Sequence, residues 1–364
     1  MLTCKNWKSG EKAAAYYLGE ELTDQVDKGI WVGRGKSIYP GIPDIVDSST
    51  LIQMADFSGN YSSQRNAVVD YTLTAPKAVS VYAALTDEEK RNKILVLQVA
   101  AARKVMEQIE ADHSMAKMSY STAEKIIQAT DKRLRPIRLG SKGRRKKDDT
   151  GADAQDKEQV YLRTHNLLAA LFTHFCTRPV DGVPDPNIHT HCVIPRITHR
   201  PDKESVTLYL DVDLPNPPLN QLYIKTMIDG LTRMGIPASY SESLDIVIEG
   251  ISDDLLNAFS LRSKKIGVVA EAMMPEAGGE AGPVEKRLAA LYTRETKDSV
   301  RWTERLPGWR MRAIAATVGE EILQLNELLS DEQTKQMLDR LWHHQEHARE
   351  KQPRRTGSGL FPGA

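Results

Sequence analysis

The stretch PDPNIHTHCVIP, residues Pro184–Pro195, indicates a turn that leads into an apolar strand. It carries two histidines, His189 and His191, on either side of Thr190. Alternate side chains of a strand share a face, so we expect both imidazoles on one side of a sheet and Thr190 on the other. A His-x-His pair is more often incidental than a pair of metal ligands, so the neighbouring segments must decide between the two.

The segment before this strand supplies a third histidine. YLRTHNLLAALFTHFCTR, residues 161–178, has a pattern that fits either a helix or a strand. PVDGVPDP follows it, with Asp-Gly and Asp-Pro turn signals, so a hairpin is reasonable and would place His174 beside the other two histidines. Three neutral imidazoles on one face suit a cation, and three protein ligands leave coordination positions open, as in catalytic metal sites.

The rest of the chain mixes helical and strand patterns without an internal repeat. SGEKAAAYYLGEEL predicts a helix capped by Ser9, and VVDYTLTAPK, residues 68–77, predicts a strand that ends in a turn. TDEEKRNKILVLQVAAARKVMEQIEADH, residues 86–113, has the length and period of a helix. We therefore expect an α/β (α+β) fold in which a central antiparallel sheet carries the three histidines and helices pack behind it.

Composition narrows the class of protein. The chain has 364 residues, of which 40% are hydrophobic and 27% charged, as in a globular protein with ample core. No apolar run is long enough to span a membrane, and the N-terminal residues lack a secretory signal, so we expect a cytoplasmic protein without membrane insertion. Cys4, Cys176 and Cys192 are too scattered for a disulfide framework or a thiolate zinc site.

Charge is balanced overall but clustered locally. The 49 basic and 49 acidic residues cancel, so any affinity for nucleic acid must come from local clusters. One such cluster is KRLRPIRLGSKGRRKK, residues 132–147, which includes Arg144 and Arg145. It is either a solvated loop, within a mobile insert at about residues 138–158, or an arm that neutralises phosphates.

Four segments, taken together, resemble a known family. They are AAAYYLGE (residues 13–20), WVGRGK (31–36), DYTLTAPKAVSV (70–81) and a histidine block of NLLAALFTHFCTR followed by DPNIHTHCVI (166–178 and 185–194). In this order they are similar to the relaxases of conjugative plasmids, of the MobF type within the HUH endonuclease superfamily, and the likeness continues to YTRETKD at residues 292–298.

This resemblance implies a reaction and its catalytic residues. Relaxases nick one DNA strand at a transfer origin and hold its 5′ end as a phosphotyrosine. The resemblance makes Tyr16 the nucleophile, while Tyr17 is either a second catalytic tyrosine or a packed ring with a hydrogen-bonded hydroxyl. Asp70 would accept the phenolic proton or orient a histidine.

The metal and DNA contacts follow from the same resemblance. The metal is expected to be Mg²⁺ or Mn²⁺, although Zn²⁺ or Ni²⁺ would also occupy a site of three imidazoles. The expected metal ligands are His174, His189 and His191, and the expected DNA-binding residues are Lys77, Arg178, Arg144 and Arg145.

The chain also departs from the family pattern. Many relatives carry a second tyrosine pair soon after the first, whereas LGEELTDQVDKG has none. A second cleavage would then need Tyr17, a second use of Tyr16, or another molecule. We expect a relaxase domain over residues 1–310, helices over 311–350 packed on or extending it, and a flexible tail over 351–364. We expect no helicase domain, since there is no phosphate-loop motif.

The expected partners are single-stranded and hairpin DNA of the transfer origin, a type IV secretion coupling protein and accessory relaxosome proteins. The C-terminal helices would clamp single-stranded DNA, and the protein is expected to be a monomer. Two other functions stay open on the sequence: a rolling-circle replication initiator with the same chemistry, and a DNA-binding accessory protein without nicking activity.

Overall fold

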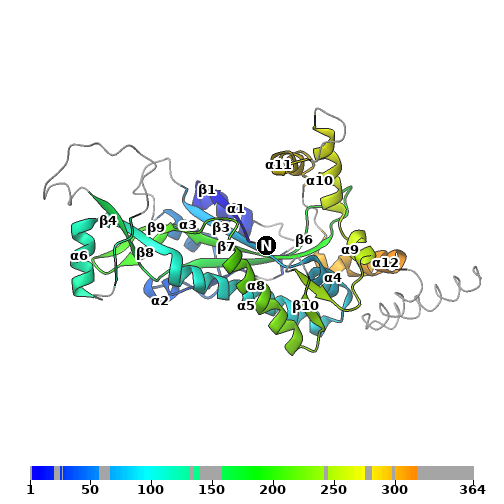
Figure 1. The fold of residues 1–364 in the computed structure, drawn as a ribbon, viewed down its shortest axis with the longest axis horizontal. Helices are drawn as coiled ribbons and strands as arrows, with labels where there is room; N and C mark the ends of the chain where they lie inside the picture. The colour runs from blue at the N-terminus through cyan, green and yellow to red at the C-terminus, as the bar shows by residue number, and fades with distance from the viewer. Residues whose placement is uncertain are drawn as a thin grey trace, which may run out of the picture.

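The structure is a computed structural model, and it describes residues 2–19, 25–26, 28–56, 66–130, 134–138, 158–241, 245–274, 281–296 and 300–317. An antiparallel sheet of five strands forms its centre, in the order β1-β3-β7-β6-β2. These strands are β1 (Leu2–Trp7), β3 (Val68–Thr74), β7 (Pro186–Pro195), β6 (Ala169–Cys176) and β2 (Ile30–Val32). The sheet runs through the middle of the molecule (Figure 1). The predicted antiparallel sheet is thereby confirmed.

Helices cover the back of this sheet. They are α4 (Lys77–Leu85), α5 (Glu88–His113) and α8 (Pro217–Arg233). Helix α5 joins the sheet by a hydrogen bond from Nε2 of Gln98 to the hydroxyl of Thr190, 3.1 Å long, and the hydroxyl of Tyr223 on α8 donates to Gln98. Thr190 therefore points away from the two histidines that flank it, as its place in the strand predicts.

The histidine face of the sheet is partly covered by α1 (Gly10–Leu18) and α3 (Ser48–Asp56). The hydroxyl oxygen of Ser9 accepts a hydrogen bond from the backbone nitrogen of Lys12, so the predicted cap of α1 is confirmed. Ala13 and Ala14 are buried against Phe172 of β6 and Val193 of β7 in the same apolar cluster. Small side chains on α1 allow the helix to lie close to the strands that carry the histidines.

A second sheet extends from one end of the molecule. Its strands follow the order β5-β4-β9-β8, and α6 packs on it. Figure 1 shows this sheet on the left, while the described helices beyond residue 250 lie on the right. The elements of the second sheet are β4 (Ser114–Ser119), α6 (Tyr120–Ala129), β5 (Gln159–Arg163), β8 (Ile197–Arg200) and β9 (Lys203–Leu210).

All but one of the remaining described elements follow α8. A short hairpin precedes four helices and a 3-10 turn, and α12 crosses the boundary expected at residue 310. These elements are β10 (Ala238–Tyr240), β11 (Ile246–Ile248), α9 (Asp253–Ala258), α10 (Leu261–Ala272), α11 (Pro283–Tyr292), η2 (Trp302–Arg305) and α12 (Leu306–Ala316), and the short α2 (Gly35–Ile38) follows β2.

Several expected features lie outside the described residues. They are Arg144 and Arg145 with almost all of the insert at 138–158, the expected helices beyond residue 317, and the tail over 351–364. None of the helices in the described ranges is long and apolar enough to cross a membrane.

Candidate active site

The three histidines lie together on one face of the central sheet. The segment around His174 forms strand β6, which pairs with β7 so that His174 stands directly opposite His189. The ring centres of His174 and His189 are 5.3 Å apart, those of His174 and His191 are 5.3 Å apart, and those of His189 and His191 are 5.2 Å apart. The predicted hairpin is confirmed, and its register creates a nearly equilateral triangle of imidazoles.

This triangle has the size that a bound cation requires. A metal–nitrogen distance of about 2.1 Å with tetrahedral angles puts the centres of three bound imidazoles roughly 5 Å apart. Within the described ranges, however, no group of three or more His, Cys, Asp or Glu side chains is arranged so that it could hold a metal ion. The three imidazoles match a divalent cation in number, type and the spacing of their ring centres. To bind it, the rings would have to turn so that one nitrogen of each faces the cation.

Hydrogen bonds fix the orientation of two of the rings. Nδ1 of His191 lies 3.0 Å from a carboxylate oxygen of Asp70 and 3.0 Å from the hydroxyl of Thr72. Nδ1 of His189 lies 2.8 Å from the carbonyl oxygen of Asn187. Such bonds to one ring nitrogen select the tautomer and leave the other nitrogen, Nε2, to bind a metal.

Asp70 is the buried centre of a polar network. It is 1% exposed, and β3 places it beside β7, where its carboxylate approaches His191. The hydroxyl of Tyr17 donates a 2.5 Å hydrogen bond to the same carboxylate. Asp70 thus joins the opening helix to the histidine strand. This arrangement suits an orienting role, because both carboxylate oxygens already have partners.

The two neighbouring tyrosines have different surroundings. Tyr17 is fully buried, and its ring stacks on Phe172 with 5.1 Å between ring centres. Burial and the Asp70 charge raise the pKa of Tyr17, so its phenol holds its proton. Tyr16 is only partly buried, and its ring centre lies 6.4 Å from that of His191. Of the two, Tyr16 is the more exposed, although the ring of Tyr17 lies closer to His191, with 5.1 Å between ring centres.

Residues that the sequence did not single out complete this face. The ammonium of Lys5 lies 3.6 Å from the centre of the Trp7 ring and 4.9 Å from that of Tyr16. Thr72, which contacts His191, could have been found from the sequence, because it lies two residues after Asp70 and so shares its face of the strand. No sequence pattern indicated Lys5 or Trp7, because their neighbours are set by the pairing of β1 with β3, a segment about 60 residues further along the chain.

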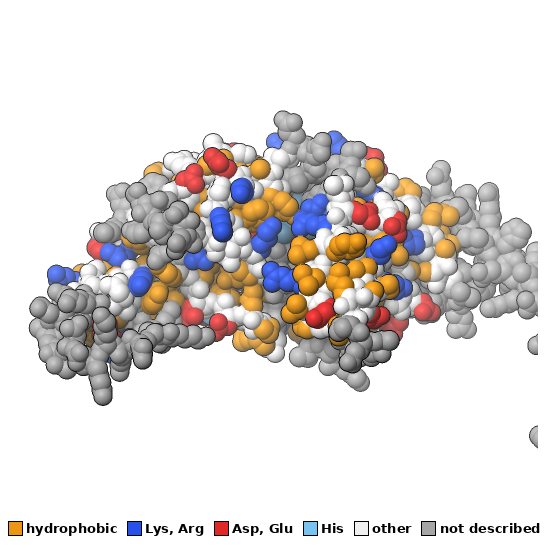
Figure 2. Space-filling view, turned by 90° about the horizontal axis from the view of Figure 1, so that it is seen from above, with side chains coloured by type: hydrophobic (Ala, Val, Ile, Leu, Met, Phe, Trp, Pro, Cys, Tyr) orange, Lys and Arg blue, Asp and Glu red, His pale blue; other side chains and the backbone are white. Residues whose placement is uncertain are grey.

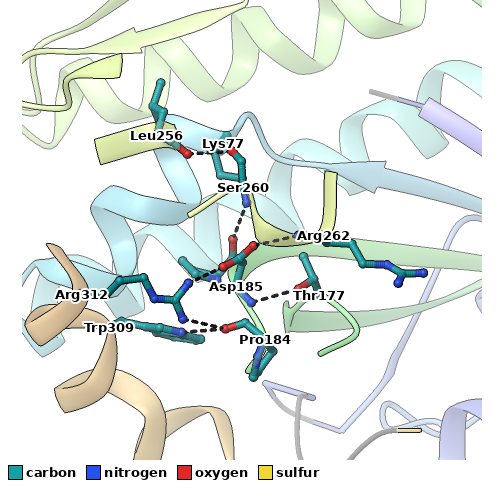
Figure 3. A network of polar contacts seen from close by, with 10 residues as sticks. Lys77, Thr177, Pro184, Asp185, Leu256, Ser260, Arg262, Trp309 and Arg312 are labelled. Carbon is teal, nitrogen blue, oxygen red and sulfur yellow. Dashed lines mark hydrogen bonds and ion pairs between the residues drawn. The ribbon is translucent and has the colours of Figure 1, made fainter. Parts of the chain in front are cut away.

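Lys77 belongs to a second network, at the turn before the histidine strand. Its ammonium donates to the carbonyl oxygen of Pro186 at 3.3 Å. Nearby, the fully buried carboxylate of Asp185 pairs with Arg312 of α12 at 2.5 Å, and the indole nitrogen of Trp309 donates to the carbonyl oxygen of Pro184 at 3.0 Å (Figure 3). These contacts fasten the last described helix to the turn that leads to His189.

The predicted basic residues do not all gather at this site. Arg178 lies two residues after the end of β6, and its charge acts on Lys5 together with that of Arg294. Lys77 lies at the turn network instead, while Arg144 and Arg145 are outside the described residues. Figure 2 shows Lys and Arg side chains grouped around the middle of one face, with a small area of His between them.

Comparison with solved structures gives the same fold. One match is the conjugative relaxase TrwC in complex with oriT DNA, metal-bound, with 20% identity, a TM-score of 0.64, and coverage of 88% of this chain and 99% of that chain. The copper-bound complex of TrwC has 21% identity and a TM-score of 0.65, with coverage of 88% and 99%. The metal-free complex has 22% identity and a TM-score of 0.62, with coverage of 86% and 98%. No curated protein matches the chain.

The family itself is established by a sequence model. The model of the TrwC relaxase matches residues 5–134 and 149–316, which is most of the chain and includes Tyr16, Asp70 and the three histidines. This match favours a relaxase over a rolling-circle initiator. The chain belongs to the TrwC relaxase family of metal-dependent enzymes that nick DNA at a transfer origin.

Proposed function

We propose that the protein nicks and religates one DNA strand at a plasmid transfer origin, with Tyr16 as the nucleophile. The observation that carries this assignment is the contrast between the two tyrosines. Tyr16 is accessible beside His191, whereas the Tyr17 hydroxyl is buried on Asp70. A nucleophile must approach phosphorus in line with the departing oxygen, which a fully buried phenol cannot do without leaving its pocket.

In the proposed step, the phenolic oxygen of Tyr16 forms a bond to phosphorus. The bond from phosphorus to the 3′ oxygen breaks, the 3′ oxygen gains the proton that the phenol loses, and the 5′ end stays on Tyr16 as a phosphodiester. The number of phosphoester bonds is unchanged, so religation needs no ATP.

The three histidines are proposed to hold the divalent cation, Mg²⁺ or Mn²⁺, with Asp70 and Thr72 fixing the ring of His191. When bound, such a cation neutralises a non-bridging phosphate oxygen and stabilises the charge of the transition state. Asp70 is proposed to be a positioning residue and Tyr17 its support. A second cleavage would then use Tyr16 again or a second molecule.

We further propose the wider setting. The substrate would be hairpin and single-stranded DNA, with Lys77, Arg178, Arg144 and Arg145 on its phosphates and the helices from α9 to α12 clamping the strand. The protein would act as a cytoplasmic monomer that delivers DNA to a type IV secretion coupling protein with accessory relaxosome proteins.

One assay tests the chemistry. Single-stranded oligonucleotides are tiled over both strands of the DNA that flanks the coding sequence and incubated with protein and Mn²⁺. We expect one oligonucleotide to form an SDS-resistant adduct. Tyr16→Phe should abolish the adduct, and Tyr17→Phe, the matched control, should retain it. A full adduct with Tyr16→Phe contradicts the nucleophile assignment, and loss with Tyr17→Phe alone assigns the nucleophile to Tyr17.

A further inference from the structure

We propose that Lys5 binds a backbone phosphate of the DNA strand next to Tyr16, and that Trp7 holds the ammonium in place for it. This inference deepens the proposed function, because it concerns the same face and the same strand of DNA. Lys5 and Trp7 are two residues apart on β1, so their side chains share a face of the sheet. Lys5 also stands directly opposite Asp70, which puts that face on the histidine side.

The position of the ammonium is defined by two aromatic rings. It lies 3.6 Å from the centre of the Trp7 ring, within the range of a cation–π contact, and 4.9 Å from that of Tyr16. The Trp7 and Tyr16 rings also contact each other, with centres 5.2 Å apart. Lys5, Trp7 and Tyr16 therefore form one cluster, in which the cation is close to the phenol that is proposed to attack phosphorus.

The charges around Lys5 point to an anionic ligand. Partial burial lowers the pKa of Lys5, the charges of Tyr16 and Asp70 raise it, and those of Arg294 and Arg178 lower it. In the described part of the chain, no carboxylate forms an ion pair with Lys5, Arg178 or Arg294. Asp70 is already engaged by Tyr17 and His191.

The charges of Arg178 and Arg294, which come from separate segments, thus act on Lys5, and none of these three residues forms an ion pair with a carboxylate in the described part of the chain. Like charges repel, and this repulsion is relieved when an anion binds among them. DNA supplies that anion as its phosphodiester. Because Tyr16 must reach one phosphorus atom, the phosphates on either side of the nick are the ones that pass beside Lys5.

The salt dependence of DNA binding tests this contact. Fluorescence anisotropy with a labelled dT oligonucleotide of about 30 nucleotides gives the affinity at 50 to 200 mM salt for wild type, Lys5→Met and Lys5→Arg. One lost contact to a single strand reduces the slope of log affinity against log salt by about 0.7. Over that fourfold salt range, the affinity of Lys5→Met should therefore fall about 2.6-fold less than that of wild type. Lys5→Arg should behave as wild type.

Lys8→Met is the matched control, because Lys8 is an exposed lysine three residues further along the chain. For Lys8→Met, the slope of log affinity against log salt should equal that of wild type. An unchanged slope for Lys5→Met overturns the proposal, and so does an equal reduction for Lys8→Met, which would indicate a general effect of net charge. Binding of dT does not require cleavage, so this result is independent of whether Tyr16 forms the adduct.

Discussion

The hydroxyl of Tyr17 and the carboxylate of Asp70 share a hydrogen bond of 2.5 Å between the opening helix and the central sheet. The same carboxylate orients His191. One buried carboxylate thus links a helix to a candidate metal ligand, so a change at Tyr17 is expected to reach the metal site through Asp70.

Tyr17→Phe removes this link while it keeps the ring that stacks on Phe172. A hydrogen bond to a charged group contributes about 1.5–3 kcal/mol, so we expect a loss of that order in the free energy of unfolding. Urea unfolding measures it. Adduct formation should persist at a lower rate, because Asp70 then holds His191 less firmly. An unchanged free energy of unfolding would show that the hydrogen bond contributes nothing.

Removal of the metal or of one ligand should stop nicking without unfolding the protein. We expect EDTA and His174→Ala each to abolish the adduct. Added Mn²⁺ should restore the adduct in EDTA-treated wild type, but not in His174→Ala. Isothermal titration calorimetry should show tighter binding of Zn²⁺ or Ni²⁺ than of Mn²⁺, because imidazole ligands bind Zn²⁺ and Ni²⁺ more strongly than Mn²⁺. His199→Ala, outside the triangle, is the control. Full activity of His174→Ala would exclude that residue as a ligand.

Asp185 and Arg312 fasten α12 to the turn before β7. Arg312→Gln leaves a buried carboxylate without its cation and should cost about 3–5 kcal/mol in the free energy of unfolding. Asp185→Asn should cost less, because the charge that it leaves unpaired, that of Arg312, is partly exposed to solvent. Urea unfolding of both single variants and the double variant gives the coupling energy. Additive effects would mean that the two side chains do not stabilise each other.

The buried carboxyl of Glu110 predicts a pH dependence. Its Oε1 accepts hydrogen bonds from the backbone nitrogens of Arg34 and Leu167, both 2.8 Å long. Burial raises the pKa of Glu110, and these two hydrogen bonds act against that rise. A carboxyl whose pKa is raised by folding stabilises the fold below its unfolded-state pKa of about 4.3, and that contribution is lost as the pH rises through the folded-state pKa.

Glu110→Gln keeps an accepting oxygen and removes the charge. The variant should be at least as stable as wild type at pH 7, and its advantage should shrink as the pH falls to 4. Urea unfolding between pH 4 and 8 checks the sign, and Glu110→Ala serves as the disruptive control. An advantage that grows toward low pH would contradict the raised pKa.

Much of the candidate site could be predicted from local patterns. Strand alternation alone places His189 and His191 on one face and Thr190 on the other, and the turn signals predict the hairpin that brings His174 alongside. Ser9 as a cap fixes where the tyrosine helix begins. These features depend on neighbours a few residues away, which is the range over which sequence patterns carry information.

Other features depend on contacts between distant segments. The different surroundings of Tyr16 and Tyr17 arise because α1 packs on β6 and β7, more than 150 residues further along the chain. The ammonium of Lys5 lies close to the ring of Tyr16 because β1 pairs with β3 in the central sheet. Arg312 meets Asp185 because α12 returns to the hairpin turn.

The sequence by itself determined which residue types are present and how they alternate along each strand and helix, since φ/ψ preferences and side-chain periodicity are local. Only the tertiary structure decided which tyrosine is buried, which carboxylate orients a histidine and which lysine lies beside the phenol. Burial and electrostatic neighbours are set by packing between segments far apart in the chain, and no local pattern encodes them.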